Sequence, residues 1–140
     1  MEAKIILLVE DDELDVISVK RSLKKLNIPH HLFVAFNGKE ALALLTDAAA
    51  PITPDVILLD LNMPKMNGIE FLKVLRKKEA FKSIKVFVMT TSSETVDRDA
   101  TAALNVAGYI LKPLNVHEQN RTDSMDAFVE FHLRRILTEK

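Results

Sequence analysis

The chain has 140 residues, of which 48% are hydrophobic and 28% are charged, and its formal net charge at pH 7 is −1. A single domain of this size buries about two-thirds of the surface that its unfolded chain exposes. The near-neutral charge argues against a nucleic-acid partner, and the sequence has no cysteine for disulfides or thiolate chemistry. It shows neither a signal peptide nor an apolar run near the ~18 residues of a membrane span. We therefore expect a cytoplasmic protein with no membrane partner.

Five short apolar segments alternate along the chain with segments of helical spacing. The apolar segments predict strands at residues 4–9, 31–36, 56–59, 86–89 and 109–111. The stretch 56–59 is apolar throughout, which is typical of a parallel strand buried on both faces. Helical spacing predicts helices at residues 14–26, 38–46, 68–77, 91–104 and 125–138. This alternation predicts an α/β fold with right-handed crossovers and a parallel sheet covered by helices on both faces.

Local signals indicate where helices begin and which residues face water. Asp12 stands at the start of the first helix, where its charge suits the helix dipole. Thr91 and Glu94 fit a capping box for the fourth helix. The third helix is expected to expose a basic, solvated face made of Lys73, Arg76, Lys77 and Lys78.

Four of the five predicted strands end in side chains that carry chemistry: Glu10-Asp11, Asp60, Thr90 and Lys112. The carboxyl ends of parallel strands meet at one edge of a sheet, so we expect these residues to converge. Neighbouring carboxylates repel by about 4 kcal/mol per pair at ~4 Å and an effective dielectric constant of ~20. Lys112 supplies one positive charge, and we expect a divalent cation to supply the remainder. Oxygen ligands favour Mg²⁺ or Mn²⁺.

A cation, a lysine and a hydroxyl around one carboxylate are suited to phosphoryl transfer. The cation and the ammonium group neutralise charge on the oxygens of the transferring group, and the hydroxyl donates to one of them. The carboxylate can itself be the nucleophile and form an aspartyl phosphate. This arrangement favours phosphoryl transfer without being unique to it.

The same residues resemble the receiver domain of two-component response regulators, in the CheY-like superfamily. The resemblance rests on Glu10-Asp11 after the first strand, D-L-N-M-P-K-M-N-G at 60–68, Thr90 thirty positions after Asp60, and Lys112-Pro113 fifty-two positions after Asp60. It covers residues 3–114. It implies a doubly wound, flavodoxin-like sheet with strand order 2-1-3-4-5.

The resemblance also implies the roles of the acidic residues. Asp60 would be the phosphoacceptor. Asp11 and Asp60 would bind Mg²⁺ (or Mn²⁺) through their carboxylates, Asn62 through its backbone carbonyl, and Glu10 through water or as an outer ligand.

Thr90, Lys112 and Tyr109 take roles from the same resemblance, and Asn62 and Ser92 are assigned a role because they flank the site. Thr90 would hydrogen-bond the phosphoryl group, and Lys112 would pair with it, next to a cis bond to Pro113. Tyr109 stands where the family has its switch aromatic, although a tyrosine at a strand end also suits simple core packing. Asn62 and Ser92 would tune the lifetime of the phosphoryl group by controlling access of water.

In this family the phosphoryl donor is a phosphohistidine on a sensor histidine kinase or a phosphotransfer protein. The receiver catalyses its own phosphorylation and dephosphorylation and is not a turnover enzyme. We expect one receiver domain at 1–140 with no output domain, a core at 3–114, an extended polar link at 115–124 and a last helix at 125–138. It resembles the stand-alone regulators associated with phytochromes. A homodimer could form through the face of the fourth helix, fifth strand and fifth helix, where an exposed Phe131 would be a natural contact.

Two other functions remain open from the sequence. A phosphorylation-independent adaptor would bind its partner constitutively, and the intact acidic pair, Thr90 and Lys112 argue against it. A free-standing phosphatase with an aspartyl nucleophile would carry a D-x-D-x-T pattern, whereas residues 60–64 read D-L-N-M-P.

Overall fold

The computed structural model describes residues 3–61, 66–90, 101–111 and 124–138. Its sheet contains β1 (Lys4–Val9), β2 (His30–Ala35), β3 (Val56–Asp60), β4 (Lys85–Thr90) and β5 (Gly108–Leu111). All neighbouring strands are parallel, and their order is β2-β1-β3-β4-β5. The predicted α/β fold class and strand order are therefore confirmed.

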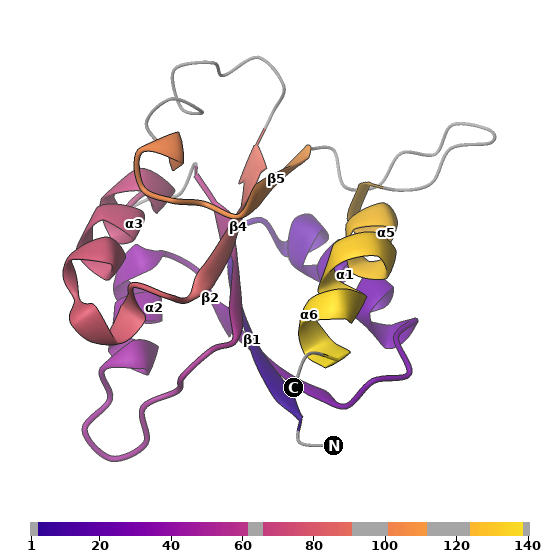
Figure 1. Cartoon of the computed structure of the whole chain (residues 1–140), viewed down its shortest axis with the longest axis horizontal. Coiled ribbons are helices and arrows are strands. Elements are labelled where there is room, and N and C mark those ends of the chain that lie inside the picture. Colours follow the sequence, from indigo (N-terminus) through magenta and orange to yellow (C-terminus); the bar gives the residue numbers. More distant parts are fainter. Residues whose placement is uncertain (1–2, 62–65, 91–100, 112–123, 139–140) are drawn as a thin grey trace.

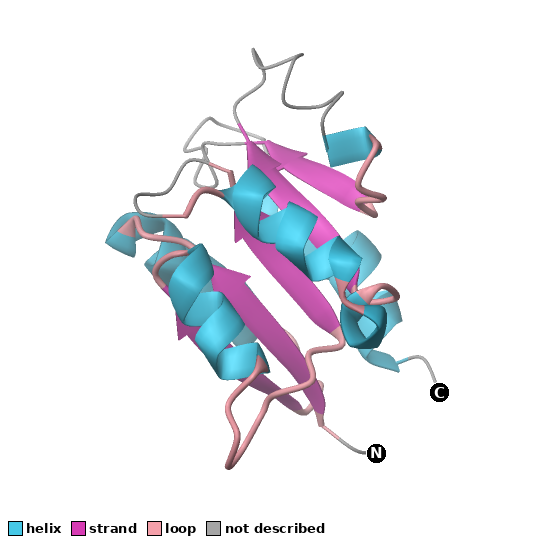
Figure 2. Ribbon diagram, turned by 90° about the vertical axis from the view of Figure 1, so that its left-hand side faces the viewer, coloured by secondary structure: helices cyan, strands magenta, loops and turns pink. Residues whose placement is uncertain are grey.

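The helices form a layer on each face of the sheet (Figures 1 and 2). One layer contains α2 (Gly38–Leu45) and α3 (Gly68–Lys77), and the other contains α1 (Glu13–Lys24), α5 (Ser124–Phe128) and α6 (Arg134–Thr138). Each layer packs on its own hydrophobic cluster. Side chains of a strand alternate between faces, so Ile6 and Leu8 join the cluster under α1, while Leu7 and Val9 join the cluster under α2. All five residues of β3 are buried, as a central parallel strand requires.

Most element boundaries agree with the sequence prediction to within two residues, but a 3-10 helix and a π-helical segment within the last helix were not predicted. A 3-10 helix, η1 (Glu79–Phe81), follows α3. The last helix is interrupted by a π-helical segment, η2 (Val129–Leu133), between α5 and α6. Helical periodicity places apolar residues on one face and does not distinguish α from π hydrogen bonding, so this interruption has no simple sequence signal. None of the helices in the described ranges has the length and apolar character to cross a bilayer.

Side-chain caps fix the beginnings of the helices. Asp12 caps α1, since its carboxylate accepts a hydrogen bond from Leu14 N at 2.9 Å, which confirms the predicted start. Asn67 forms a reciprocal capping box with Glu70 at the start of α3. The predicted capping box of Thr91 and Glu94 lies outside the described residues. Asp12 directly follows the predicted acidic residue Asp11, and α3 begins at Gly68, whose N–H binds the Leu61 carbonyl just after Asp60.

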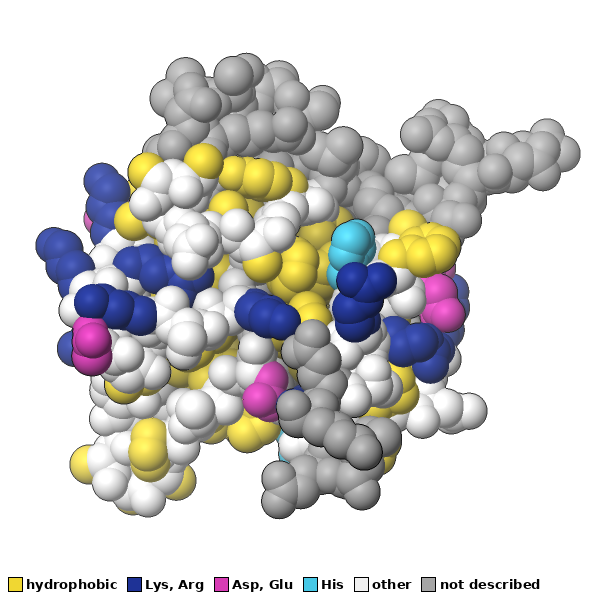
Figure 3. All heavy atoms as spheres, viewed as in Figure 1, with side chains coloured by type: hydrophobic (Ala, Val, Ile, Leu, Met, Phe, Trp, Pro, Cys, Tyr) yellow, Lys and Arg dark blue, Asp and Glu magenta, His cyan; other side chains and the backbone are white. Residues whose placement is uncertain are grey.

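Arg76 was predicted to be solvated, and that prediction was wrong. The exposed lysines of α3 do form a basic surface, visible over α3 in Figure 3. Arg76 instead is partly buried and donates hydrogen bonds to the carbonyl oxygens of Phe81, Lys82, Leu104 and Asn105 at 2.9–3.1 Å. Burial lowers its pKa, yet a guanidinium remains charged at neutral pH. Arg76 therefore ties α3 to two connections that precede β4 and β5.

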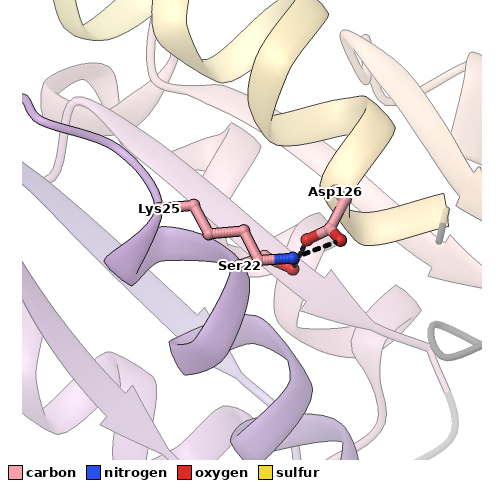
Figure 4. A network of polar contacts seen from close by, with 3 residues as sticks. All are labelled: Ser22, Lys25 and Asp126. Carbon is pink, nitrogen blue, oxygen red and sulfur yellow. Dashed lines mark hydrogen bonds and ion pairs between the residues drawn. The ribbon is translucent and has the colours of Figure 1, made fainter. Parts of the chain in front are cut away.

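A second polar network joins α1 to α5 (Figure 4). The carboxylate of Asp126 accepts hydrogen bonds from Ser22 Oγ and from Lys25 Nζ, the latter at 2.7 Å. Burial raises the pKa of the Asp126 carboxyl, but the hydrogen bonds from Lys25 and Ser22 and the charges of Lys25 and Arg21 outweigh this and hold the pKa below its ordinary value. The network fixes the last helix on the face of the sheet that α1 covers.

Candidate functional site

The predicted acidic residues meet at one edge of the sheet. β1 and β3 are neighbours with Val9 opposite Leu59, so Glu10 and Asp60, which come next, emerge side by side. Asp11 follows Glu10 in the connection to α1. Carboxylate oxygens of Glu10, Asp11 and Asp60 all lie within 4.8 Å of one another. The predicted convergence of these three side chains is therefore present in the structure.

The three carboxylates differ in exposure. Glu10 is fully buried and Asp60 is 3% exposed, whereas Asp11 is exposed. Glu10 Oε2 accepts a hydrogen bond from the backbone N–H of Asp11 at 3.1 Å and a longer one from Asp12 at 3.5 Å. These bonds hold the Glu10 side chain over the first turn after β1. The cluster therefore has a fixed, buried base and one side open to solvent.

This donor set fits a hard divalent cation. Its ligand atoms are all carboxylate oxygens, and the cluster contains no histidine to favour zinc. Two nearly buried carboxylates beside a third repel one another strongly unless a positive charge compensates them. A cation that keeps several waters, as Mg²⁺ does, suits a site that is open on one side. The residues present thus fit the predicted Mg²⁺ or Mn²⁺.

Gly68 supports the connection that follows Asp60. A Cβ atom at position 68 would lie 2.5 Å from the Asp60 carbonyl oxygen and 2.7 Å from Leu61 Cα. The backbone N–H of Gly68 also donates to the Leu61 carbonyl at 3.0 Å. Only a residue without a side chain permits this approach, so Gly68 sets the position of the backbone at the end of β3.

The other predicted site residues are described only in part. Thr90 is the last residue of β4, opposite Leu111 of β5, so its backbone reaches the same edge as Asp60. Asn62, Ser92 and Lys112 lie outside the described residues, and their predicted roles are untested.

Tyr109 lies in β5 and packs at the margin of the hydrophobic cluster on the α3 side, as the core-packing interpretation expected. Its hydroxyl also lies 2.8 Å from Oγ1 of Thr101, which is fully buried. Sequence reasoning missed Thr101, because a lone threonine near the end of a helix gives no signal of a partner eight positions away.

The family described as "Response regulator receiver domain" matches residues 6–121. This chain belongs to that family. The match begins within β1, covers the other four strands and the acidic cluster, and includes the residues on which the predicted resemblance rests. The chain is therefore a receiver domain of two-component signal transduction, in which a phosphoryl group is the signal.

Individual relatives are similar over most of the chain. Response regulator Rcp1 from Synechocystis sp. is 38% identical over 119 residues, which cover 82% of this chain and 80% of Rcp1. The crystal structure of the Mn²⁺-bound form of Rcp1 has a TM-score of 0.81, with 33% identity over 98% of this chain and 97% of that chain. The structure of the phosphorylated cyanobacterial phytochrome response regulator RcpA has a TM-score of 0.83, with 31% identity and 96% coverage of each chain.

Proposed function

We propose that Asp60 accepts a phosphoryl group from a phosphohistidine of a partner sensor histidine kinase or phosphotransfer protein. The observation that carries this proposal is the convergence of Asp60 with Glu10 and Asp11 at the carboxyl edge of the sheet. Asp60 ends the central strand β3 and is only 3% exposed, so burial holds it in place. Asp60 is thus the rigid carboxylate next to an open face.

The transfer step follows from the chemistry of the two partners. An oxygen of the Asp60 carboxylate forms a bond to phosphorus, and the bond between phosphorus and the imidazole nitrogen of the donor breaks. That nitrogen keeps the electron pair and takes up a proton. The signal ends by hydrolysis. Water attacks phosphorus, the bond between phosphorus and the Asp60 oxygen breaks, the Asp60 carboxylate is regenerated, and inorganic phosphate is released. The chain is restored, so the receiver acts as a switch.

Glu10, Asp11 and Asp60 would hold Mg²⁺, with the Asn62 backbone carbonyl as a further ligand. The ion supplies positive charge for the oxygens of the transferring group. Thr90 would donate a hydrogen bond to the phosphoryl group and Lys112 would pair with its charge. The Mn²⁺-bound form of Rcp1 supports a divalent cation in this family's fold.

Two residues beside the site would control how long the phosphoryl group persists. Asn62 and Ser92 would govern the approach of the attacking water. Substituting either should change the rate of dephosphorylation while leaving Asp60 as the acceptor.

We infer that the signal is read on the β5 and last-helix side of the molecule. Tyr109 would change its side-chain position when Asp60 carries the phosphoryl group. Phe131 on the neighbouring η2 segment is 69% exposed, and hydrophobic side chains reach the surface between β5 and the last helix (Figure 3). We propose this surface as the contact of a homodimer. Analytical ultracentrifugation of wild type and Phe131→Glu, with and without phosphorylation, tests it.

Acetyl phosphate with Mg²⁺ tests the main proposal. Intact mass spectrometry should show one added phosphoryl group on the wild type, none on Asp60→Asn and none in the presence of a chelator. Asp55→Asn is the matched control, since Asp55 lies at the opposite end of β3. Equal incorporation into Asp60→Asn would refute the assignment, and turnover of small phosphate esters far beyond self-dephosphorylation would favour a phosphatase instead.

A further inference from the structure

We propose that the groove between α1 and the edge strand β2 binds an acidic, extended segment of a partner protein, which adds to the sheet beside β2. The groove lies at the opposite end of the strands from Asp60. It is lined by His30, the first residue of β2, whereas the acidic cluster follows the last residues of β1 and includes the last residue of β3. The inference concerns the binding of a second protein and does not depend on phosphorylation.

The groove has an apolar floor and a basic rim. It measures about 460 Å³ and is lined by Leu23, Leu26, Leu32, Lys20, Lys24 and His30. Leu23 and Leu26 are buried in the cluster under α1, and Leu32 packs against that cluster. Both lysines are exposed, and no lining residue is acidic. An occupant therefore needs apolar side chains for the floor and negative charges for the rim.

The two lysines lie on the side of α1 that faces away from the last helix. Ser22 and Lys25, which bind Asp126 of α5, lie on the other side (Figure 4). Residues four apart share one face of a helix, so Lys20 and Lys24 form a single basic stripe. Within the described ranges, neither of these two lysines has an ion-pair partner, whereas Lys25 pairs with Asp126. Their charges are therefore available to a ligand.

The outer edge of β2 offers backbone hydrogen bonds beside the groove. β2 is the last strand of the sheet and pairs with β1 alone. The Ala35 carbonyl accepts from the Glu10 N–H, in the direction of β1. Backbone groups alternate in direction along a strand, so those of Leu32 and Val34 face outward. The side chains of these two residues pack on the α1 side, so a chain that pairs with this edge lies directly beside the groove.

Over residues 30–35, β2 carries none of the features that usually block such pairing. Edge strands are commonly protected by a lysine, a proline or a bulge. β2 reads H-H-L-F-V-A and pairs with β1 in one unbroken register. An extended peptide can therefore form main-chain bonds with the edge while its alternate side chains enter the groove.

Charge and shape favour an acidic peptide over two other occupants. A small molecule would leave the backbone groups of β2 unused, and a groove open to solvent does not enclose it as small-molecule sites do. A second copy of the chain would pair its β2 antiparallel about a two-fold axis. Both α1 helices would then lie on one face of the joined sheet, where Lys20 and Lys24 of the two copies repel. An acidic segment instead meets both lysines and the leucine floor.

A peptide array tests the proposal. Its peptides, about as long as β2, alternate leucine or valine with glutamate, glutamine or lysine. We expect the wild-type chain to bind glutamate peptides and not lysine peptides. The double variant Lys20→Glu with Lys24→Glu should bind the glutamate peptides at least about fivefold more weakly and should gain binding of the lysine peptides. The matched control, Lys77→Glu with Lys78→Glu at exposed positions by α3, should bind as the wild type does.

Hydrogen exchange locates the bound peptide. At about ten times its Kd, the tightest glutamate peptide should slow exchange of the Leu32 and Val34 amides about tenfold. The same peptide with N-methyl groups on the amides that face β2 should not bind. Three results would overturn the proposal: no binding of any glutamate peptide, binding unchanged in the Lys20 and Lys24 variant, or unchanged exchange at both amides in the complex. Slow exchange at these amides in a concentration-dependent dimer, without peptide, would assign the edge to a second copy instead.

Discussion

The position that a Cβ atom would take on Gly68 lies 2.5 Å from the main-chain carbonyl oxygen of Asp60. Since the obstacle is backbone, no side-chain rotation can relieve it. Gly68 at the start of α3 thus sets the place of the proposed phosphoacceptor at the end of β3. The glycine has a role in the site although it has no side chain to react.

Gly68→Ala should therefore weaken both the fold and the site. Forcing the backbone apart costs about 1–3 kcal/mol in free energy of unfolding, and it displaces the Asp60 carboxylate from Glu10 and Asp11. Urea unfolding and the rate of phosphorylation by acetyl phosphate measure the two effects. Gly38→Ala is the comparison, because its Cβ would lie 2.7–2.9 Å from the flexible side chain of Met66 and 3.0 Å from Phe71 Cβ, but against no main-chain atom. Equal phosphorylation rates in the two variants would contradict this role of Gly68.

The acidic cluster should bind Mg²⁺ through the carboxylates that follow β1, Glu10 and Asp11, as well as through Asp60 at the end of β3. Asp11→Asn and Glu10→Gln each remove one negative charge from the set, so each should raise the dissociation constant for Mg²⁺ about tenfold or more. Isothermal titration calorimetry measures it directly. Asp15→Asn, on α1 beyond the cluster, controls for a general change in charge. Unchanged Mg²⁺ affinity in both cluster variants would show that the cation binds elsewhere.

Asp126 should make the stability of the domain depend on pH in acid. Its pKa in the folded chain lies below the unfolded value of about 3.9. The stabilisation is therefore complete above the unfolded pKa and is lost as the pH falls through the folded pKa. Asp126→Asn should lower the free energy of unfolding by about 1 kcal/mol at pH 7, and this difference should shrink below about pH 4.

The control for Asp126 is an ion pair of the same length with greater exposure. Glu79 and Lys82 also lie 2.7 Å apart, but both side chains are more than half exposed. Glu79→Gln should change the free energy of unfolding by less than about 0.5 kcal/mol. Urea unfolding from pH 3 to pH 7 compares the two variants. A constant effect of Asp126→Asn across that range would contradict the assignment of a lowered pKa.

Arg76 should contribute far more to stability than its neighbour Lys77. Arg76→Met removes the guanidinium from four carbonyl oxygens, of which Phe81 O keeps a longer bond from Ile84 N–H, and the expected loss in the free energy of unfolding is about 2–4 kcal/mol. Lys77→Met, at an exposed position of the same helix, should change it by less than about 0.5 kcal/mol. Similar melting temperatures for the two variants would mean that the guanidinium bonds contribute little.

The fold class could be predicted because the apolar runs are local in the sequence, and the strand order came from the resemblance to receiver domains. Residues 56–59 are apolar because β3 is buried on both faces, and the acid Asp60 at the end of this run stands out. Glu10 and Asp60 meet because adjacent parallel strands end at one edge, which needs only the strand order.

The features that sequence reasoning missed depend on tertiary contacts. In the sequence, Arg76 resembles the exposed lysines of the same basic helix face. Its hydrogen bonds to the carbonyl oxygens of residues 104 and 105 become visible only in the folded structure. Thr101 meets Tyr109 only because the turn between them folds back beside β5. The π-helical segment at Val129–Leu133 has the same apolar spacing as an ordinary helix. Predicting any of these features requires knowledge of which elements pack together.

Chemical mapping of the phosphorylated residue tests the central claim most directly. Borohydride reduces an acyl phosphate to an alcohol, so an aspartyl phosphate becomes homoserine at the modified position. After treatment with acetyl phosphate and Mg²⁺, reduction and trypsin digestion, the peptide of residues 40–65 should contain homoserine at position 60, with Asp47 and Asp55 unchanged. Homoserine in the peptide of residues 5–20, which carries Asp11, or at Asp55 in place of Asp60, would contradict the assignment of Asp60 as the phosphoacceptor.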